Sequence, residues 1–238
     1  MELTSTANSK VKYWQKLKDK KYRDQEKLFL IEDEHLVEEA LKTNVVKEII
    51  TIENKKYDID TYYVNDKIMN LLSNQVSGSK VIAVCHQLEE KELNGNIIIL
   101  DGIQDPGNLG TIIRSAVAFN FDTIVLSNTS VDLYNPKVIR ASEGMIFNIN
   151  VIRTDILNFI DNLDSEYTLV TTDVRNGKNI KNIKFKKIAL VIGNEGNGVS
   201  EEVASKCIEK VYIKINNNCE SLNAGVCASI LMYEVSYE

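Results

Sequence analysis

The chain has 238 residues, of which 44% are hydrophobic and 26% are charged, and its formal net charge is −6. This length allows one large domain or two small ones, and the composition is that of an ordinary soluble globular protein. The acidic balance argues against a uniformly basic nucleic-acid-binding protein, and no apolar run approaches the roughly 18 residues that a membrane span needs.

Cysteine and histidine usage narrows the possible chemistry further. The four cysteines show no CxxC spacing, which argues against structural zinc, and the first residues lack the apolar core of a signal peptide. We therefore expect a cytoplasmic protein with reduced thiols. The only histidines, His35 and His86, lie in the first half, so the second half has no histidine to act as a base or to bind a metal.

The first 27 residues are basic, with eight Lys and Arg against four Asp and Glu, which leaves −10 for the remainder. Asn8 is a candidate N-cap for a helix over about residues 9–21, in which Val11, Trp14 and Leu17 form a narrow apolar stripe among lysines. Two interpretations of its charge stay open: a basic arm that binds RNA, or a solvated helix face. Tyr13 and Trp14 could stack on bases, but an apolar stripe of this kind more often docks the helix onto the body of the protein.

Residues 22–86 are expected to form a small α/β unit. Strands are predicted at 28–31, 45–52, 62–64 and 81–84, with one helix containing Leu36 to Leu41 and a short helix capped by Asn65 that ends near Leu72. Residues 87–96 are polar and end in a turn signal, so we place the domain boundary there.

Residues 97–238 alternate strands and helices. Continuous apolar strands are predicted at 97–100, 123–127, 169–172, 188–192 and 211–215. Helices are expected after Asn108 as an N-cap, from Asn135-Pro136, over 155–163, and from Ser221 as the N-cap of the last helix. This alternation predicts a mostly parallel sheet sandwiched by helices.

Three polar loops follow strands of this second half and would meet at one edge of the sheet, where ligands bind in open α/β folds. The first contains Asn108 and leads to Arg114, a guanidinium beside the apolar helix face for which we favour a functional role over a structural ion pair. The second, Gly193 to Gly198, is neither a dinucleotide-binding fingerprint nor a P-loop, and its Glu195 disfavours a phosphate ligand. The third is the amide-rich stretch 216–223.

These segments carry a resemblance. Residues 108–119 resemble the first motif of the SpoU/TrmH family of RNA ribose 2′-O-methyltransferases, residues 191–198 resemble the second, and residues 220–223 with the following helix resemble the third. Residues 136–144 are similar to a further family segment, and residues 22–86 look like the L30e-type domain that precedes the catalytic domain. One departure is Lys214, where family members often have proline, which affects the expected path of the cofactor loop.

The resemblance implies a fold and an organisation. A small L30e-like α/β domain for RNA would precede a SPOUT methyltransferase domain with a trefoil knot, which general fold rules make a rare exception. The implied parts are a basic helical arm at 1–21, the L30e-like domain at 22–86, a linker at 87–96 and the methyltransferase domain at 97–238. The implied cofactor is S-adenosylmethionine, and the implied partners are RNA and a second copy of the chain, with no metal and no membrane.

The resemblance also implies site residues. Arg114 would bind the RNA phosphate and lower the pKa of the ribose 2′-hydroxyl electrostatically, since a guanidinium is a poor base. Asn108 and Asn223 would fix the loops and the ribose, and Glu195 would orient Arg114 or the substrate. The implied cofactor-binding residues are Leu126, Gly193, Asn194, Gly196, Ile213, Ser221 and Leu222.

We therefore expect a 2′-O-methyltransferase of structured RNA, with ribosomal RNA of the large subunit favoured and tRNA as the alternative within the class. A non-catalytic RNA-binding protein is a second alternative, disfavoured because Arg114, Glu195 and Asn223 are all present. A Rossmann-type nucleotide enzyme is a third, disfavoured by the glycine spacing.

Overall fold

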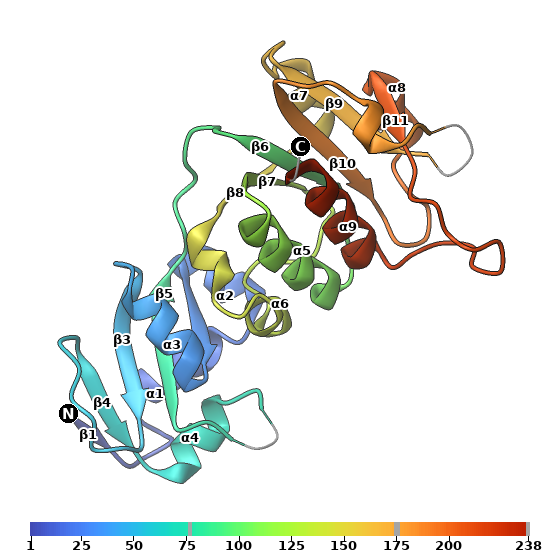
Figure 1. Cartoon of the computed structure of the whole chain (residues 1–238). Coiled ribbons are helices and arrows are strands. Elements are labelled where there is room, and N and C mark those ends of the chain that lie inside the picture. Colours follow the sequence, from blue (N-terminus) through green and yellow to red (C-terminus); the bar gives the residue numbers. More distant parts are fainter. Residues whose placement is uncertain (76–77, 174–176, 237–238) are drawn as a thin grey trace. The chain divides into compact units, whose positions relative to one another are not determined.

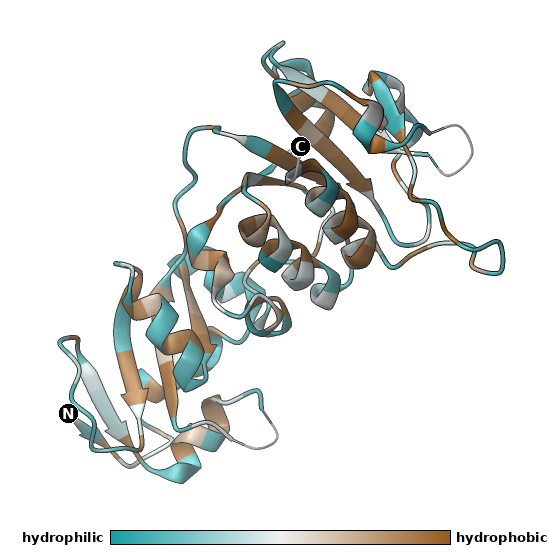
Figure 2. Ribbon diagram, viewed as in Figure 1, coloured by the Kyte–Doolittle hydropathy of each residue, from teal (hydrophilic) through white to brown (hydrophobic). Residues whose placement is uncertain are grey.

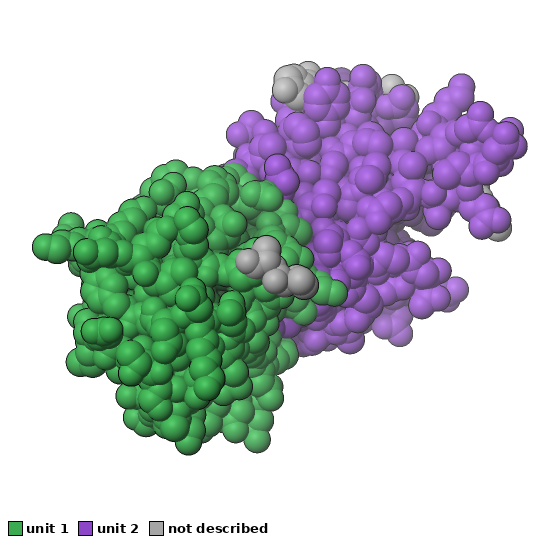
Figure 3. Space-filling model, turned by 90° about the horizontal axis from the view of Figure 1, so that it is seen from below, with its two compact units in different colours: residues 1–89, 134–147 green, residues 90–133, 148–238 purple. Residues whose placement is uncertain are grey.

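A computed structural model describes residues 1–75, 78–173 and 177–236, and the chain divides into two compact units (Figures 1 and 3). Unit 1 comprises residues 1–89 and 134–147, and unit 2 comprises residues 90–133 and 148–238. No helix in the described residues is long and apolar enough to cross a membrane.

Within the described residues, unit 1 contains a mixed five-stranded sheet in the order β1-β4-β3-β5-β2. Parallel pairing joins β1 to β4 and β4 to β3, whereas β5 is antiparallel to both β3 and β2. The strands are β1 (Glu2–Leu3), β2 (Leu28–Glu32), β3 (Val46–Thr51), β4 (Thr61–Val64) and β5 (Val81–His86).

In the part of unit 1 that the structure describes, the helices are α1 (Ser9–Lys16), α2 (Lys20–Glu26), α3 (Glu34–Leu41), α4 (Asp66–Leu72) and α6 (Pro136–Ala141). The helix predicted over 9–21 is instead two helices, because the Asp19 side chain accepts a hydrogen bond from the Lys21 N–H and starts a new helix there. Asn8 caps α1 as expected, and Asn65 caps α4.

Helix α1 belongs to the core of unit 1. Val11, Trp14 and Leu17 are buried, and the Trp14 indole donates a 2.8 Å hydrogen bond to the carboxylate of Glu48, which is only 5% exposed. Lys10 Nζ lies 2.5 Å from the other Glu48 oxygen. Neither interpretation of the basic segment describes it fully, since several of its cations hold unit 1 together.

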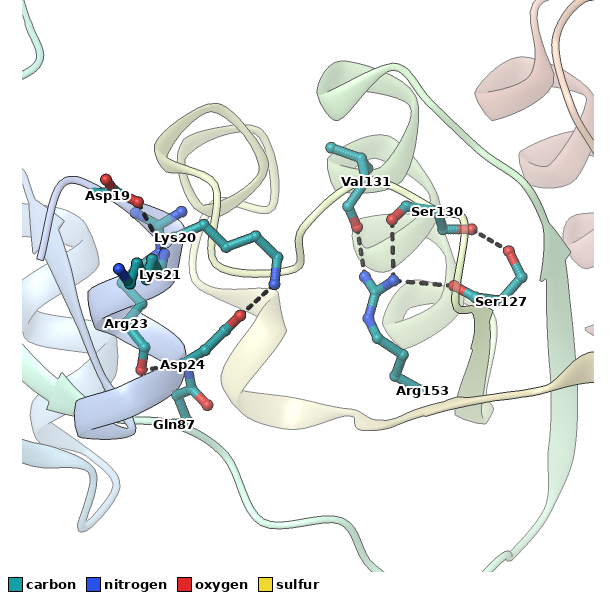
Figure 4. Close-up of polar contacts among 10 residues, drawn as sticks. All are labelled: Asp19, Lys20, Lys21, Arg23, Asp24, Gln87, Ser127, Ser130, Val131 and Arg153. Atoms are coloured by element: carbon teal, nitrogen blue, oxygen red, sulfur yellow. Dashed lines mark hydrogen bonds and ion pairs between the residues drawn. The ribbon is translucent and has the colours of Figure 1, made fainter.

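Three more of these cations have intramolecular partners. Lys18 donates to the carbonyls of Leu71 and Ser73, and Lys20 pairs with Asp24. The buried Arg23 donates to the carbonyls of Leu17 and Lys18, and its own carbonyl accepts from Gln87, as Figure 4 shows in part.

Unit 2 contains a six-stranded parallel sheet within the described residues, in the order β11-β9-β10-β6-β7-β8. The prediction of a mostly parallel sheet is confirmed. The strands are β6 (Asn96–Asp101), β7 (Phe121–Ser127), β8 (Asn150–Thr154), β9 (Tyr167–Thr172), β10 (Lys187–Gly193) and β11 (Glu209–Val211). The central strand β10 is apolar over most of its length, as its burial on both faces requires (Figure 2).

Helices cover both faces of this sheet. Helices α7 (Ile156–Asp161) and α8 (Glu201–Lys206) pack on one face, where Ile156 and Val203 join Ile97 and Val191 in one core cluster. Helices α5 (Pro106–Ala118) and α9 (Ala224–Ser236) lie side by side on the other (Figure 1). A short 3₁₀ turn, η2 (Ile180–Asn182), occurs in unit 2, and another, η1 (Met145–Asn148), lies where the chain returns from unit 1.

Three local predictions in unit 2 are wrong. Helix α5 begins at Pro106, because Asp105 is its N-cap and accepts from the Asn108 N–H at 2.8 Å, so Asn108 lies inside the first turn. Helix α9 begins at Ala224, and Asn223 rather than Ser221 accepts from a first-turn N–H, that of Val226. The predicted strand 211–215 is instead β11, which ends at Val211.

The burial of Trp14 gives a prediction for stability. Trp14→Phe retains an aromatic ring in the core but removes one hydrogen bond to a buried carboxylate, so we expect a loss of about 1–3 kcal/mol of unfolding free energy. The unfolding free energy is measured by urea unfolding followed by far-UV circular dichroism. Tryptophan fluorescence cannot be used, because the variant lacks the chain's single Trp. Tyr13→Phe, which removes an exposed hydrogen bond to Glu26, is the control; an equally small effect of both changes would contradict a structural role for α1.

Candidate active site

A cavity of about 410 Å³ opens at the carboxyl ends of β9, β10 and β11 in unit 2. Three segments line most of it: residues 192–198 after β10, residues 211–215 after β11, and residues 221–224 at the start of α9. Its volume falls in the range of roughly 300–1,000 Å³ that is usual for small-molecule sites. The edge of the sheet predicted to bind a ligand therefore carries a pocket of suitable size.

The loop after β10 is tight and requires glycine. A Cβ atom on Gly193 would lie 2.1 Å from the backbone of Gly198 and Val199, and Gly198 has a φ of +71°. Asn194 and Gly198 exchange two backbone hydrogen bonds of 2.9 Å. The side-chain oxygen of Asn194 also accepts a 2.8 Å hydrogen bond from the Gly196 N–H. The loop thus holds Glu195 in one position at its tip.

The Glu195 carboxylate joins this loop to the loop after β6. It accepts hydrogen bonds from the Asn108 side chain at 2.9 Å, from the Asp105 N–H at 3.1 Å and from the Gln104 N–H at 3.2 Å. Partial burial alone would raise the pKa of Glu195, but these hydrogen bonds together lower it below its ordinary value. Glu195 is therefore held as a carboxylate.

Asn108 extends the connection to the third segment. While its amide N–H donates to Glu195, its oxygen accepts a 2.7 Å hydrogen bond from the Asn223 side chain. Asn223 in turn caps α9 through its own oxygen. A continuous chain of hydrogen bonds, Glu195–Asn108–Asn223, therefore joins the three motifs. Because Asp105 performs the capping of α5, the Asn108 side chain is available for this bridging role.

The segment after β11 offers unpaired backbone groups. Ile213 and Leu222 line the cavity, and among the described residues their backbone N–H and C=O groups have no hydrogen-bond partner. Such groups beside apolar side chains suit a flat heterocycle with polar edges. A carboxylate nearby also suits a cationic ligand with hydroxyl and amino groups, so these residues fit S-adenosylmethionine.

The structure gathers most of the predicted cofactor-binding residues at this cavity. Its lining includes Gly193, Asn194, Gly196, Ile213, Ser221 and Leu222. Leu126 is fully buried within β7 and is not among the lining residues.

Arg114 lies elsewhere on its helix. It is exposed and makes no ion pair or hydrogen bond with the part of the chain that the structure describes. Arg114 is six residues after Asn108, and a helix turns by about 100° per residue, so the two side chains point to different sides of α5. Glu195 accepts hydrogen bonds from Asn108 and from the 104–105 backbone, and it forms no hydrogen bond or ion pair with Arg114 in the described residues.

Two supporting residues were not found from the sequence. Asp101, the last residue of β6, accepts hydrogen bonds from the N–H and the hydroxyl of Ser200 at 2.9 and 2.7 Å and so anchors the far end of the glycine loop. The Arg153 guanidinium donates to the carbonyls of Ser127, Ser130 and Val131, which closes the loop after β7 (Figure 4). The sequence could have indicated Asp101, because a single Asp ends an apolar strand there. No sequence pattern indicates the role of Arg153.

Comparison with known proteins agrees with this geometry. Residues 95–233 match the SpoU rRNA Methylase family, and residues 8–87 match the MRM3-like substrate binding domain. The chain is 37% identical to the 23S rRNA (guanosine(2553)-2′-O)-methyltransferase RlmP of Bacillus subtilis over 244 residues, which cover 98% of each chain.

Solved structures give the same result. An AdoMet-bound rRNA methyltransferase from Sinorhizobium meliloti is 26% identical, with a TM-score of 0.88 over 98% of this chain and 96% of that one. A structure described as an RNA 2′-O ribose methyltransferase is 27% identical, with a TM-score of 0.79 over 98% and 97%.

The chain belongs to the SpoU rRNA methylase family. The resemblance stated from the three motifs is confirmed, and so are the predictions of an RNA 2′-O-ribose methyltransferase and of S-adenosylmethionine as its cofactor.

The bridging position of Asn108 gives a second prediction. Asn108→Ala removes one hydrogen bond from the Glu195 carboxylate and leaves Asn223 without its partner, so we expect S-adenosylmethionine to bind about tenfold or more weakly. Isothermal titration calorimetry measures this. Asn197→Ala removes an exposed amide of the same glycine loop and is the matched control. Equal affinities for the two variants would contradict the bridging role.

The lowered pKa of Glu195 gives a third prediction. A depressed carboxyl pKa stabilises the site fully above the ordinary Glu value of about 4.3, and this contribution is lost as pH falls through the lower folded-state value. Cofactor affinity, followed by fluorescence or calorimetry, should therefore show no titration by Glu195 between about pH 8 and pH 5. A transition in that interval that Glu195→Gln abolishes would contradict the assignment.

Proposed function

We propose that this protein methylates the 2′-hydroxyl of one guanosine in 23S ribosomal RNA, and that it does so in the cytoplasm. The observation that carries the proposal is the Glu195–Asn108–Asn223 chain at the mouth of a ligand-sized cavity. The choice of target is supported by the likeness to RlmP over 98% of both chains. The two family matches support a division of labour in which unit 1 binds RNA and unit 2 performs the transfer.

The cofactor-binding residues in this proposal are those that line the cavity of unit 2. Gly193 and Gly196 let the backbone come close to the ligand, Asn194 holds the glycine loop, and Ile213, Ser221 and Leu222 form the opposite wall. When bound, S-adenosylmethionine supplies a methyl group that is already a strong electrophile. The chain's own residues then have to position the ribose and assist the departure of its proton.

We assign these tasks to four residues. Asn108 and Asn223 hold the loops around the ribose, and Glu195 fixes Asn108 and the backbone at Gln104 and Asp105. Arg114 binds the RNA phosphate and lowers the pKa of the 2′-hydroxyl, because a permanent positive charge stabilises the developing alkoxide. The cofactor held by the cavity residues would supply the methyl group to the 2′-oxygen, and the hydroxyl proton would leave to water.

The position of Arg114 leads us to propose a homodimer. Arg114 is exposed on α5, and on the adjacent helix α9 two large apolar side chains are exposed, Val226 at 45% and Tyr233 at 48%. Pairing of the α5–α9 surfaces of two copies would cover these side chains. It would also allow Arg114 of one subunit to serve the cavity of the other.

The path of the last segment is consistent with the trefoil knot that we propose for unit 2. A Cβ on Gly177 would lie within 2.7 Å of the Val211 and Tyr212 backbones, and the Lys178 carbonyl accepts from the Tyr212 N–H. The chain beyond β11 therefore passes directly against residues 177–178 before it forms α9. We likewise propose an L30e-like fold for residues 22–86 of unit 1.

The function is tested by methyl transfer. Tritiated S-adenosylmethionine is incubated with the protein and total RNA from cells that lack this modification. We expect label in 23S rRNA, recovered after alkaline hydrolysis as one resistant dinucleotide that begins with 2′-O-methylguanosine. Label in tRNA alone, or in an alkali-labile nucleotide, would overturn the proposal.

The composite site is tested by mixing two inactive variants. Arg114→Ala should abolish turnover while cofactor affinity stays nearly unchanged. Glu195→Ala should be inactive because it disrupts the cofactor cavity of its own subunit. If Arg114 acts in the partner's site, refolding the two variants together restores one intact site per heterodimer, or about a quarter of wild-type activity for random pairing. No recovery, in a mixture shown to contain heterodimers, would place Arg114 in its own subunit's site.

A further inference from the structure

Unit 1 contains a second cavity, of about 300 Å³, that the methyl-transfer chemistry does not use. It is lined by β2, β5, α3, α4 and α6, all within unit 1. Its floor is apolar: Ile31, Leu36, Leu72, Ile82 and Ile139 are each at most 3% exposed. The volume is at the lower end of the usual range for ligand sites, so it suits one compact group and not an extended segment.

One carboxylate faces this cavity in a fixed position. Glu32, the last residue of β2, accepts a 2.6 Å hydrogen bond from the Ser73 hydroxyl, and its two oxygens accept from the Asn74 N–H at 3.0 and 3.1 Å. These contacts hold the carboxylate against the end of α4. A carboxylate has about four lone-pair sites, so it retains the capacity to accept further hydrogen bonds from a ligand.

Two cations stand at the rim. Lys137 and Arg140 are three residues apart on α6, which places them on the same side of the helix, and both are exposed lining residues. Neither forms an ion pair in the described ranges of the chain. This differs from Lys10, Lys18 and Lys20, which have partners within unit 1. The cations of α6 are therefore available for an anionic ligand.

We propose that this cavity binds one unstacked guanine base of the RNA substrate. The inference rests on the proposed function only in taking RNA as the substrate. Guanine presents two neighbouring donors, N1–H and the 2-amino group, on its Watson–Crick edge, and a fixed carboxylate accepts from both together. The apolar floor receives the base, and Lys137 and Arg140 bind the adjoining phosphates.

The other bases fit this arrangement less well. Adenine and cytosine each place an acceptor beside their amino group, which would face the negative carboxylate, and uracil flanks its single N–H with two carbonyls. A protein partner is disfavoured, because the cavity holds one compact group and not an extended segment, and because Lys137 and Arg140, which form no ion pair in the described residues, suit phosphates. The site is thus a determinant of base identity at one position of the RNA.

The first test measures base preference directly. The full chain is titrated with fluorescent pentaribonucleotides of uridine whose central residue is guanosine, inosine or adenosine. We expect the guanosine oligonucleotide to bind at least about fivefold more tightly than the inosine one, which lacks only the 2-amino group. Glu32→Gln should bind all three alike, and Arg140→Ala should weaken all three equally.

Matched controls separate recognition from folding. Lys47→Ala removes an exposed lysine of the same unit that does not line the cavity, and should change nothing. Glu32 also holds Ser73 and Asn74, which follow α4, so thermal unfolding is recorded for each variant. The ratio of guanosine to inosine affinity is then compared, because a merely structural role would not change this ratio. No preference by the wild-type chain, a preference retained by Glu32→Gln, or no binding of any oligonucleotide would overturn the proposal.

A second test locates the base. With 6-thioguanosine at the central position, irradiation should produce adducts within 30–36, 72–74 or 135–140, the segments that line the cavity. Adducts confined to residues 192–223 would place guanine at the methyl-transfer site and contradict the proposal. Both tests measure binding, so methylation of 23S rRNA by a chain that fails them would overturn this inference and leave the proposed function intact.

Discussion

The Glu195 carboxylate is the contact on which the methyl-transfer site depends, because it connects segments that are about ninety residues apart in the chain. It accepts from the Asn108 side chain and from two backbone N–H groups, and Asn108 passes the connection on to Asn223 at the start of α9. Partial burial removes some of the water around this carboxylate, and the donors that replace it come from Gln104, Asp105 and Asn108, so the hydrogen bonds favour one relative position of the two loops. Two of the loops joined in this way, residues 193–198 and 221–223, line the cavity together with residues 211–215.

A comparable carboxylate organises unit 1. Glu48 is buried and is satisfied by Trp14 and Lys10, which ties the first helix to the sheet and turns a segment that looks like a basic arm into part of the core. The charge that remains available for RNA in unit 1 therefore includes Lys137 and Arg140 of α6, which form no ion pair within the described residues and line the second cavity. Net charge alone, at −6, gives no indication of this distribution.

Much of this organisation follows from sequence pattern. The apolar runs of β6 and β10 and the alternation of strands with helices predict a parallel sheet, and the glycines of residues 193–198 predict a tight loop beyond it. Pattern failed where two residues competed for one role. Asp105 and Asn108 are both good N-caps, and so are Ser221 and Asn223, and only tertiary contacts decide between them. The strand predicted at 211–215 was wrong because its apolar residues face a cavity instead of a neighbouring strand. Arg153 could not be found, because its three carbonyl partners come from a loop whose shape the local sequence does not specify.

Glu195 and Asn108 should act as one unit in holding the cofactor cavity, because each is the hydrogen-bond partner of the other. A double-mutant cycle for S-adenosylmethionine binding tests it most directly, with Asn108→Ala, Glu195→Ala and the double variant compared by calorimetry. If the two side chains act as one unit, the double variant loses less binding free energy than the two single variants added together, by about 1 kcal/mol or more. Strictly additive losses would show that the two side chains act independently.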